Sequence, residues 1–232
     1  MRTRTSAMRS AMDGADEAEE EAVMTLPAGY SEEANALWDA AQALNRAAGA
    51  VSLPPLLFFT DPTRTPRPWE TAARLPAGAG VVFRAFGAPG AEAIGRRLRE
   101  ATRTAGARLL VGLDADLAER IGADGVHLPE RAAGRAAELK ARRPEWRVTA
   151  AWHGAEPAPS GVDALVLSPV FPAGGASAEK SALGVMGFAR KAATAGAPVY
   201  ALGGVGADNA AHLMDSGACG VAGVEAIQAA FA

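Results

Sequence analysis

The stretch PVYALGGVGADNAAHLMDSGACGVAGVEAI, residues 198–227, decides which fold the sequence predicts. Two short apolar runs in it, 198–202 and 220–222, have the composition of buried strands. The first leads directly into Gly203-Gly204 and the second into Gly223, and a helical pattern follows each turn. Strands that alternate with helices form parallel sheets, in which the carboxyl ends of the strands share one edge. The two glycine turns are therefore expected side by side.

A full helix is expected between these two strands. Either Asp208 or Asn209 has a side chain suited to cap its start, and Gly217 is suited to end it. The expected apolar positions are Ala211, Leu213 and Met214.

The same alternation of apolar runs and helical patterns extends upstream to about residue 54. Eight strands are expected, at 55–61, 80–83, 108–111, 125–128, 147–151, 163–168, 198–202 and 220–222. Helical patterns or their remnants follow each strand, including one expected helix at 130–143. This order predicts an α/β fold, an eight-fold parallel (β/α) barrel. A doubly wound open sheet is the alternative, but the turn at 60–63 (TDPT) lacks the glycine-rich dinucleotide fingerprint.

The chain before the barrel divides into two parts. Residues 1–29 are basic and then acidic, with little apolar content, and are expected to be a disordered tail. Ser31 starts an extra N-terminal helix at 31–48, which has acidic residues in its first turn and an apolar side. The predicted organisation is thus a tail and one domain at 30–232, with the barrel at about 54–232.

The composition limits the function classes. Of 232 residues, 49% are hydrophobic and the net charge is −3, which fits one globular domain and disfavours nucleic-acid binding. No apolar run approaches the ~20 residues of a membrane span, and residues 1–12 lack a signal-peptide apolar region. A cytoplasmic protein is expected. The single Cys219 excludes an internal disulfide and is expected to be a buried hydrophobe. The sequence leaves a homo-oligomer open.

The glycine turns also carry a functional expectation. In (β/α) barrels, a phosphate commonly binds at the loops after the seventh and eighth strands. Glycine lets backbone N–H groups approach an anion closely. The backbone at Gly203, Gly204, Gly223 and Val224 is therefore expected to bind a phosphate. The alternative is that these glycines only form tight connections.

Five motifs occur in an order that resembles a known family. They are FFTD (58–61), ADGVHL (123–128), SPVFP (168–172), ALGGV (201–205) and GVA (220–222). Together they resemble the thiamine phosphate synthase superfamily, which also contains the thiazole tautomerases. The resemblance covers about residue 54 to the C-terminus. It implies an eight-fold (β/α) barrel and a site for a thiazole phosphate or thiamine phosphate.

The chain departs from the synthases where they bind Mg²⁺ and a pyrimidine methyl pyrophosphate. Of their Gln-Leu-Arg-x-Lys motif, only Arg84 is retained. Leu113 and Ala132 stand where the resemblance implies metal-binding Asp residues. Mg²⁺ needs hard oxygen ligands, and these side chains offer none. Asp114 and Glu130 are near enough in sequence to act as replacement ligands.

The tautomerase branch moves a proton on a thiazole carboxylate phosphate and needs no metal. The resemblance implies that His153 moves the proton, and a histidine suits that role near neutral pH. Arg84 is expected to bind the anionic end of the substrate, and the resemblance adds Lys180 and Ser168 as phosphate-binding candidates. Glu225 stands where the family has a small residue, and a carboxylate there repels a phosphate unless it is paired. His127 is expected to orient the barrel rim or to lie partly inside the barrel rather than to do chemistry.

The leading expectation is therefore a metal-independent, tautomerase-like protein of thiamine biosynthesis or salvage, with no cofactor. Two alternatives stay open. One is a Mg²⁺-dependent thiamine phosphate synthase with displaced metal ligands. The other is a non-catalytic barrel that binds a phosphate ligand and has a regulatory role.

Overall fold

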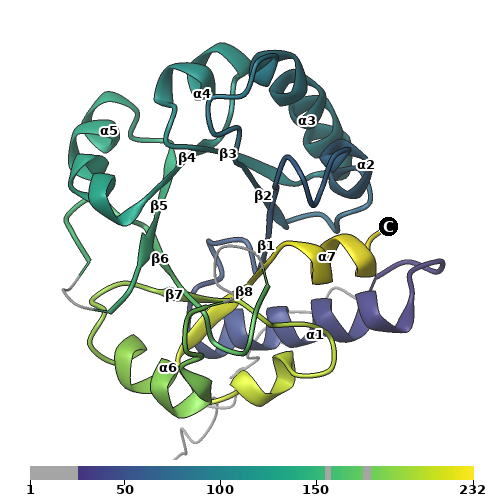
Figure 1. The fold of residues 1–232 in the computed structure, drawn as a ribbon, viewed down its shortest axis with the longest axis vertical. Helices are drawn as coiled ribbons and strands as arrows, with labels where there is room; N and C mark the ends of the chain where they lie inside the picture. Colours follow the sequence, from purple (N-terminus) through teal and green to yellow (C-terminus); the bar gives the residue numbers. More distant parts are fainter. Residues whose placement is uncertain (1–25, 155–157, 175–178) are drawn as a thin grey trace, which may run out of the picture.

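Eight parallel strands close into a barrel in the computed structural model, which describes residues 26–154, 158–174 and 179–232 (Figure 1). The strands pair in sequence order, and β8 closes the barrel by pairing with β1. They are β1 (Leu56–Phe59), β2 (Gly80–Phe83), β3 (Arg108–Gly112), β4 (Gly125–Leu128), β5 (Arg147–Trp152), β6 (Ala164–Leu167), β7 (Val199–Leu202) and β8 (Ala218–Gly223). The eight-fold barrel expectation is confirmed, and the open doubly wound sheet is wrong.

Helices surround the barrel on its outer face (Figure 1). They are α1 (Glu32–Ala47), α2 (Pro68–Ala72), α3 (Ala91–Ala105), α4 (Ala115–Ile121), α5 (Ala136–Arg142), α6 (Gly184–Ala192) and α7 (Glu225–Ala230). The described residues also include the 3₁₀ segments η1 (Glu130–Arg135), before α5, and η3 (Ala210–Leu213), after β7. The single helix expected at 130–143 is therefore a 3₁₀ segment followed by a shorter α-helix.

The full helix expected after β7 is wrong, because only η3 forms there. The side chain of Asn209 does not cap it. Its oxygen accepts a hydrogen bond from the Gly206 N–H (3.0 Å), and its amide donates to the Gly204 carbonyl (2.8 Å). Met214, expected on the apolar side, is 40% exposed. Asn209 therefore fixes the conformation of the glycine loop at the expense of a longer helix.

The extra N-terminal helix α1 forms as expected. The Ser31 hydroxyl caps it by accepting from the Ala34 N–H (3.1 Å), and Leu37, Trp38 and Leu44 are buried. Residues 1–25 of the expected tail and residues 155–157 lie outside the described residues, whereas Leu26 is partly buried against the core.

Asn45 fastens α1 to the barrel. Its side-chain amide lies within hydrogen-bond distance of the carbonyls of Ala50 (3.0 Å), Leu53 (3.3 Å) and Cys219 (3.0 Å). Asn45 is only 5% exposed, so water does not replace these bonds easily. One side chain thus joins the end of α1, the chain leading into β1, and strand β8.

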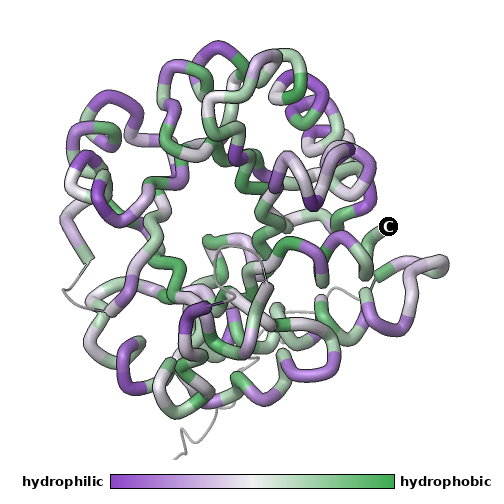
Figure 2. Tube along the Cα trace, viewed as in Figure 1, coloured by the Kyte–Doolittle hydropathy of each residue, from purple (hydrophilic) through white to green (hydrophobic). Residues whose placement is uncertain are grey.

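Alternate residues of each strand divide the core into two parts. In β1, Leu56 and Phe58 belong to the cluster between the strands and the helices, while Leu57 and Phe59 belong to the smaller cluster inside the barrel. Figure 2 shows hydrophobic stretches, in green, along the strands that form the barrel. Cys219 belongs to the inner cluster, and burial raises the pKa of its thiol. It is therefore a buried hydrophobe, as expected.

None of the helices in the described part of the chain combines the length and apolar character of a membrane span.

Replacing Asn45 by Ala should lower the free energy of unfolding by about 1–3 kcal/mol, because buried carbonyls would lose their donor. Urea unfolding followed by circular dichroism measures this. Asn35→Ala is the matched control, because Asn35 lies on the same helix and its amide donates to Ser31 at an exposed position. Equal losses in the two variants would contradict the role assigned to Asn45.

Candidate active site

A cavity of about 330 Å³ opens at the carboxyl ends of the barrel strands. The loops after β1, β2, β6, β7 and β8 form its walls. The lining includes Arg64, Arg84, Pro172, Gly203, Gly204, Gly206, Asp208, Asn209, Gly223, Val224 and Glu225. The two glycine turns thus lie side by side, as the sequence predicts. Active sites of (β/α) barrels lie at this end.

The backbone of the first glycine turn has conformations that favour glycine. The φ angles are +95° at Gly203 and +67° at Gly204. An added Cβ would lie 2.8 Å from the Cα of Pro169 at Gly203, and 2.4 Å from the carbonyl oxygen of Pro172 at Gly204. The close approach of the loop after β6 therefore requires both glycines. This packing leaves bare backbone on the cavity wall.

Arg84 follows β2 and brings a buried positive charge to the cavity. Its Nε donates to the Thr60 carbonyl (2.7 Å), and its guanidinium lies 5.4 Å from the centre of the Phe59 ring. Its buried Nη2 has no hydrogen-bond partner within the described residues, and the nearest carboxylate oxygen, on Asp61, is 3.7 Å away. Burial lowers the pKa of Arg84, and Asp61 offsets part of this effect. An incompletely paired guanidinium at a cavity wall favours an anionic ligand.

Arg64 links the two sides of the cavity mouth. Its guanidinium lies 3.1 Å from the Asp61 carboxylate on its own loop and 3.5 Å from the Glu225 carboxylate after β8. Burial raises the pKa of Asp61, but hydrogen bonds from Arg64 and Thr63 outweigh this and leave that pKa below its ordinary value. The side chain of Glu225 is 61% exposed. The carboxylate that would repel a phosphate is thus paired with an arginine.

A second group of polar side chains lies after β4, β5 and β6. Glu130 begins η1, and its Oε1 accepts from the backbone N–H of His153 (2.9 Å) while its Oε2 lies 2.5 Å from the His153 Nδ1. Lys180 Nζ lies 3.5 Å from the His153 Nε2, and Lys191 of α6 donates to the His153 carbonyl (3.1 Å). Burial raises the pKa of Glu130, but the hydrogen bonds from His153 outweigh this and keep it below its ordinary value.

The predicted site residues therefore fall into two groups. Arg84, Gly203, Gly204, Gly223 and Val224 line the cavity. His153 and Lys180 form the second group instead, and Ser168 belongs to neither. Sequence analysis missed Arg64, which lies in no recognised motif, and weighed Glu130 only as a metal ligand.

The carboxylates near the positions that the resemblance implies for metal ligands already contact other groups of the protein. Asp114 caps α4 by accepting from the Leu117 N–H (2.8 Å), and both oxygens of Glu130 face His153. Across residues 26–154, 158–174 and 179–232, no three His, Cys, Asp or Glu side chains gather where they could hold a metal ion. Mg²⁺ prefers carboxylate oxygens that remain open to it.

His127 is a structural histidine. It is 8% exposed on β4, its Nδ1 lies 2.9 Å from the Thr149 hydroxyl, and its ring packs edge-on against Phe59. Burial and, secondarily, the charge of Arg84 lower the pKa of His127 to about 3. The ring therefore stays neutral near pH 7.

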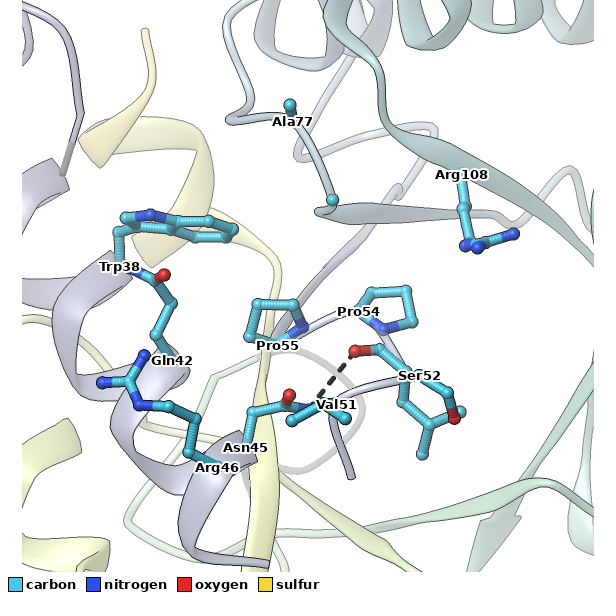
Figure 3. A pocket seen from close by; sticks show the side chains of 12 residues that line it. Trp38, Gln42, Asn45, Arg46, Val51, Ser52, Pro54, Pro55, Ala77 and Arg108 are labelled. Carbon is cyan, nitrogen blue, oxygen red and sulfur yellow. Dashed lines mark hydrogen bonds between the residues drawn. The ribbon is translucent and has the colours of Figure 1, made fainter. Parts of the chain in front are cut away.

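A second cavity, also of about 330 Å³, lies at the opposite end of the barrel beside α1 (Figure 3). Trp38, Pro54 and Pro55 form much of its wall. Arg46 and Arg108 lie on opposite sides of it and do not point toward a common centre (Figure 3). The residues that line it offer no convergent polar groups for chemistry, so the cavity at the carboxyl ends remains the candidate active site.

The fold and this cavity define a (β/α)₈ barrel protein whose cavity at the carboxyl ends of the strands is lined by Arg64, Arg84 and two glycine turns. The family model described as thiamine monophosphate synthase matches residues 68–227. The chain belongs to this family, which confirms the resemblance that the sequence motifs indicated.

Known relatives agree with this assignment. A putative thiamine-phosphate synthase of Geobacter sulfurreducens is 32% identical over 138 residues, covering 58% of this chain and 65% of that protein. A thiamine-phosphate synthase of Moorella thermoacetica is 30% identical, covering 58% and 66%. The matches thus span just under two thirds of these relatives. A solved thiamine phosphate pyrophosphorylase from Pyrococcus furiosus superposes with a TM-score of 0.62 at 25% identity, covering 76% of this chain and 91% of that one.

The depressed pKa of His127 should make the fold less stable in acid. In the unfolded chain this histidine takes up a proton near pH 6.5, whereas in the folded protein it does so only near pH 3. The free energy of unfolding should therefore fall by about 2 kcal/mol from pH 7 to pH 5 because of this residue. Urea unfolding of His127→Gln at both pH values should lack this part of the loss. The exposed His212→Gln should retain it, and the same pH dependence in both variants would contradict the assignment.

Proposed function

We propose that this barrel binds a thiazole phosphate in the cavity at its carboxyl ends and transfers a proton on it without a metal ion, as a tautomerase-like protein of thiamine biosynthesis or salvage. The observation that carries the proposal is the Glu130–His153 pair. It supplies an oriented imidazole on the same barrel face as the cavity. In this pair the Glu130 carboxylate contacts His153, whereas a synthase with displaced ligands would need that carboxylate for Mg²⁺.

The phosphate would meet positive charge and bare backbone. Arg84 offers its unpaired Nη2, and Arg64 can turn from Glu225 to the ligand, since their 3.5 Å contact is exposed and weak. The backbone at Gly203 and Gly223 lies on the adjoining wall. Charge-assisted hydrogen bonds from arginine to phosphate are among the strongest in proteins.

The proposed reaction is an isomerisation and needs no co-reactant. The His153 Nε2 takes a proton from one position of the thiazole carboxylate phosphate, and the electron pair of the broken bond shifts a ring double bond. The imidazolium then returns a proton at another ring position, so substrate and product have the same atoms. General acid–base catalysis of this kind typically contributes 10²–10⁴-fold.

A thiamine phosphate synthase is the second candidate, because the matched relatives carry that name. It predicts Mg²⁺-dependent formation of thiamine phosphate from the pyrimidine pyrophosphate and the thiazole phosphate. Formation of that product by the purified protein would overturn the proposed metal-independent reaction. A barrel that binds the phosphate ligand without turnover in either assay would be a non-catalytic binder.

Glu225→Gln should bind inorganic phosphate and thiazole phosphate about two- to fivefold more tightly than the unmodified protein. The change removes a negative charge at the cavity mouth and frees Arg64, and an exposed pair of this kind is worth up to about 1 kcal/mol. Calorimetric titration without Mg²⁺ measures this. Glu33→Gln, on the far helix α1, serves as the control and should leave the affinity unchanged. Weaker binding by Glu225→Gln would contradict the phosphate site.

His153→Ala should lose at least about 100-fold in turnover of the thiazole carboxylate phosphate while keeping its affinity for thiazole phosphate. The reason is that the groups proposed to hold the phosphate, Arg84, Arg64 and the glycine backbone, are left unchanged by this substitution. Conversion followed by NMR gives the turnover, and calorimetry gives the affinity. Unchanged turnover in the variant would rule out His153 as the proton carrier.

A further inference from the structure

The carboxylate of Glu130 holds His153 at two points. One oxygen accepts from the backbone N–H at 2.9 Å and the other lies 2.5 Å from the ring Nδ1. The two residues come from the ends of different strands, since Glu130 follows β4 and His153 follows β5. Two contacts from one side chain fix both the position of the loop and the orientation of the imidazole ring.

Two lysines lie on the other side of His153, one at the ring and one at the backbone. Lys180 Nζ faces the Nε2 atom at 3.5 Å, and Lys191 of α6 donates to the carbonyls of His153 (3.1 Å) and Gly154 (3.3 Å). An ammonium group can only donate hydrogen bonds, so the Nε2 atom that faces it must be unprotonated and accept with its lone pair. Among the described residues, Glu130 and Lys180 are the charged groups printed in contact with the ring nitrogens, and Lys191 contacts the backbone beside them.

A carboxylate, by contrast, can only accept hydrogen bonds, so the Nδ1 that it contacts must carry the proton. We propose that Glu130 is a positioning residue that fixes His153 in the tautomer protonated at Nδ1, which makes Nε2 the atom that exchanges the proton. This inference rests on the proposed function for its catalytic consequence, but the tautomer itself is a property of the free protein. The partner of one ring nitrogen thus determines what the other can do.

Glu130→Gln tests this with a minimal change of shape. The oxygen of a glutamine amide can still accept from the backbone N–H of His153, and its NH₂ group then faces Nδ1 as a donor. Nδ1 would therefore become the acceptor and Nε2 would carry the proton, and the Lys180 ammonium, which can only donate, would have to turn away from Nε2. Nε2 would then have no lone pair to take a proton from a substrate. The substitution should invert the tautomer without displacing the ring.

The direct measurement is ¹⁵N NMR of protein labelled in the histidine rings, near pH 8 and without any ligand. His153→Gln identifies the His153 signals among those of the three histidines. In the unmodified protein, Nε2 should show the shift of an unprotonated ring nitrogen, and in Glu130→Gln that of a protonated one. Glu138→Gln on α5 is the matched acid-to-amide control and should leave both shifts unchanged.

The kinetic readout follows the same logic. In Glu130→Gln, kcat for the thiazole carboxylate phosphate should fall about 10²–10⁴-fold, with KM little changed because Glu130 does not line the cavity. Glu130→Asp keeps an acceptor-only group and should retain the Nδ1-protonated tautomer and part of the activity. If Glu130→Gln does not fold, Glu130→Asp still tests whether a carboxylate at this position sets the tautomer.

Two results would overturn the inference: an Nε2 that is already protonated in the unmodified protein, or a tautomer unchanged in folded Glu130→Gln. If the tautomer inverts as expected but the unmodified protein turns over no thiazole substrate, the positioning role is supported and the proposed function fails. The two failures are therefore distinguishable.

Discussion

The pairing of β8 with β1 is the contact on which the rest of the structure depends. Leu57 aligns with Ala222 and Phe58 with Gly223, so the last strand lies beside the first. Because all strands are parallel, their carboxyl ends then form one ring. This closure brings Arg64 from the start of the barrel within 3.5 Å of Glu225 near its end, although 161 residues separate them.

Much of the fold follows from local sequence patterns. Each strand is a short apolar run that is almost wholly buried, and such runs are visible without any tertiary information. The helix expected after β7 shows the limit of this reasoning. Asn209 resembles a helix cap in sequence, but its side-chain oxygen accepts from the Gly206 N–H and its amide donates to the Gly204 carbonyl. The loop after β6 packs closely against Gly204. Tertiary packing thus overrides the local signal.

The candidate site likewise has one part that the sequence predicts and another that depends on the three-dimensional fold. The adjacency of Gly203 and Gly223 follows from the strand order alone, so the sequence predicts it. The pairing of Glu130 with His153 does not, because it depends on how two loops 23 residues apart turn at the barrel rim. For the same reason Glu130 resembles a metal ligand in sequence, whereas in the fold its oxygens face an imidazole.

Two carboxylates at the carboxyl ends of the strands, Glu225 and Glu130, bear on different parts of the proposed chemistry. Glu225 places negative charge beside the expected phosphate, but Arg64 lies between it and Asp61 and keeps the mouth of the cavity from being acidic. In sequence, Glu130 is two residues before Ala132, where the resemblance implies a metal-binding Asp, and in the structure its two oxygens contact the Nδ1 and the backbone N–H of His153. The proposal of proton transfer in place of metal-assisted departure of pyrophosphate rests on Leu113 and Ala132, where the resemblance implies metal-binding Asp residues, and on the pairing of Glu130 with His153.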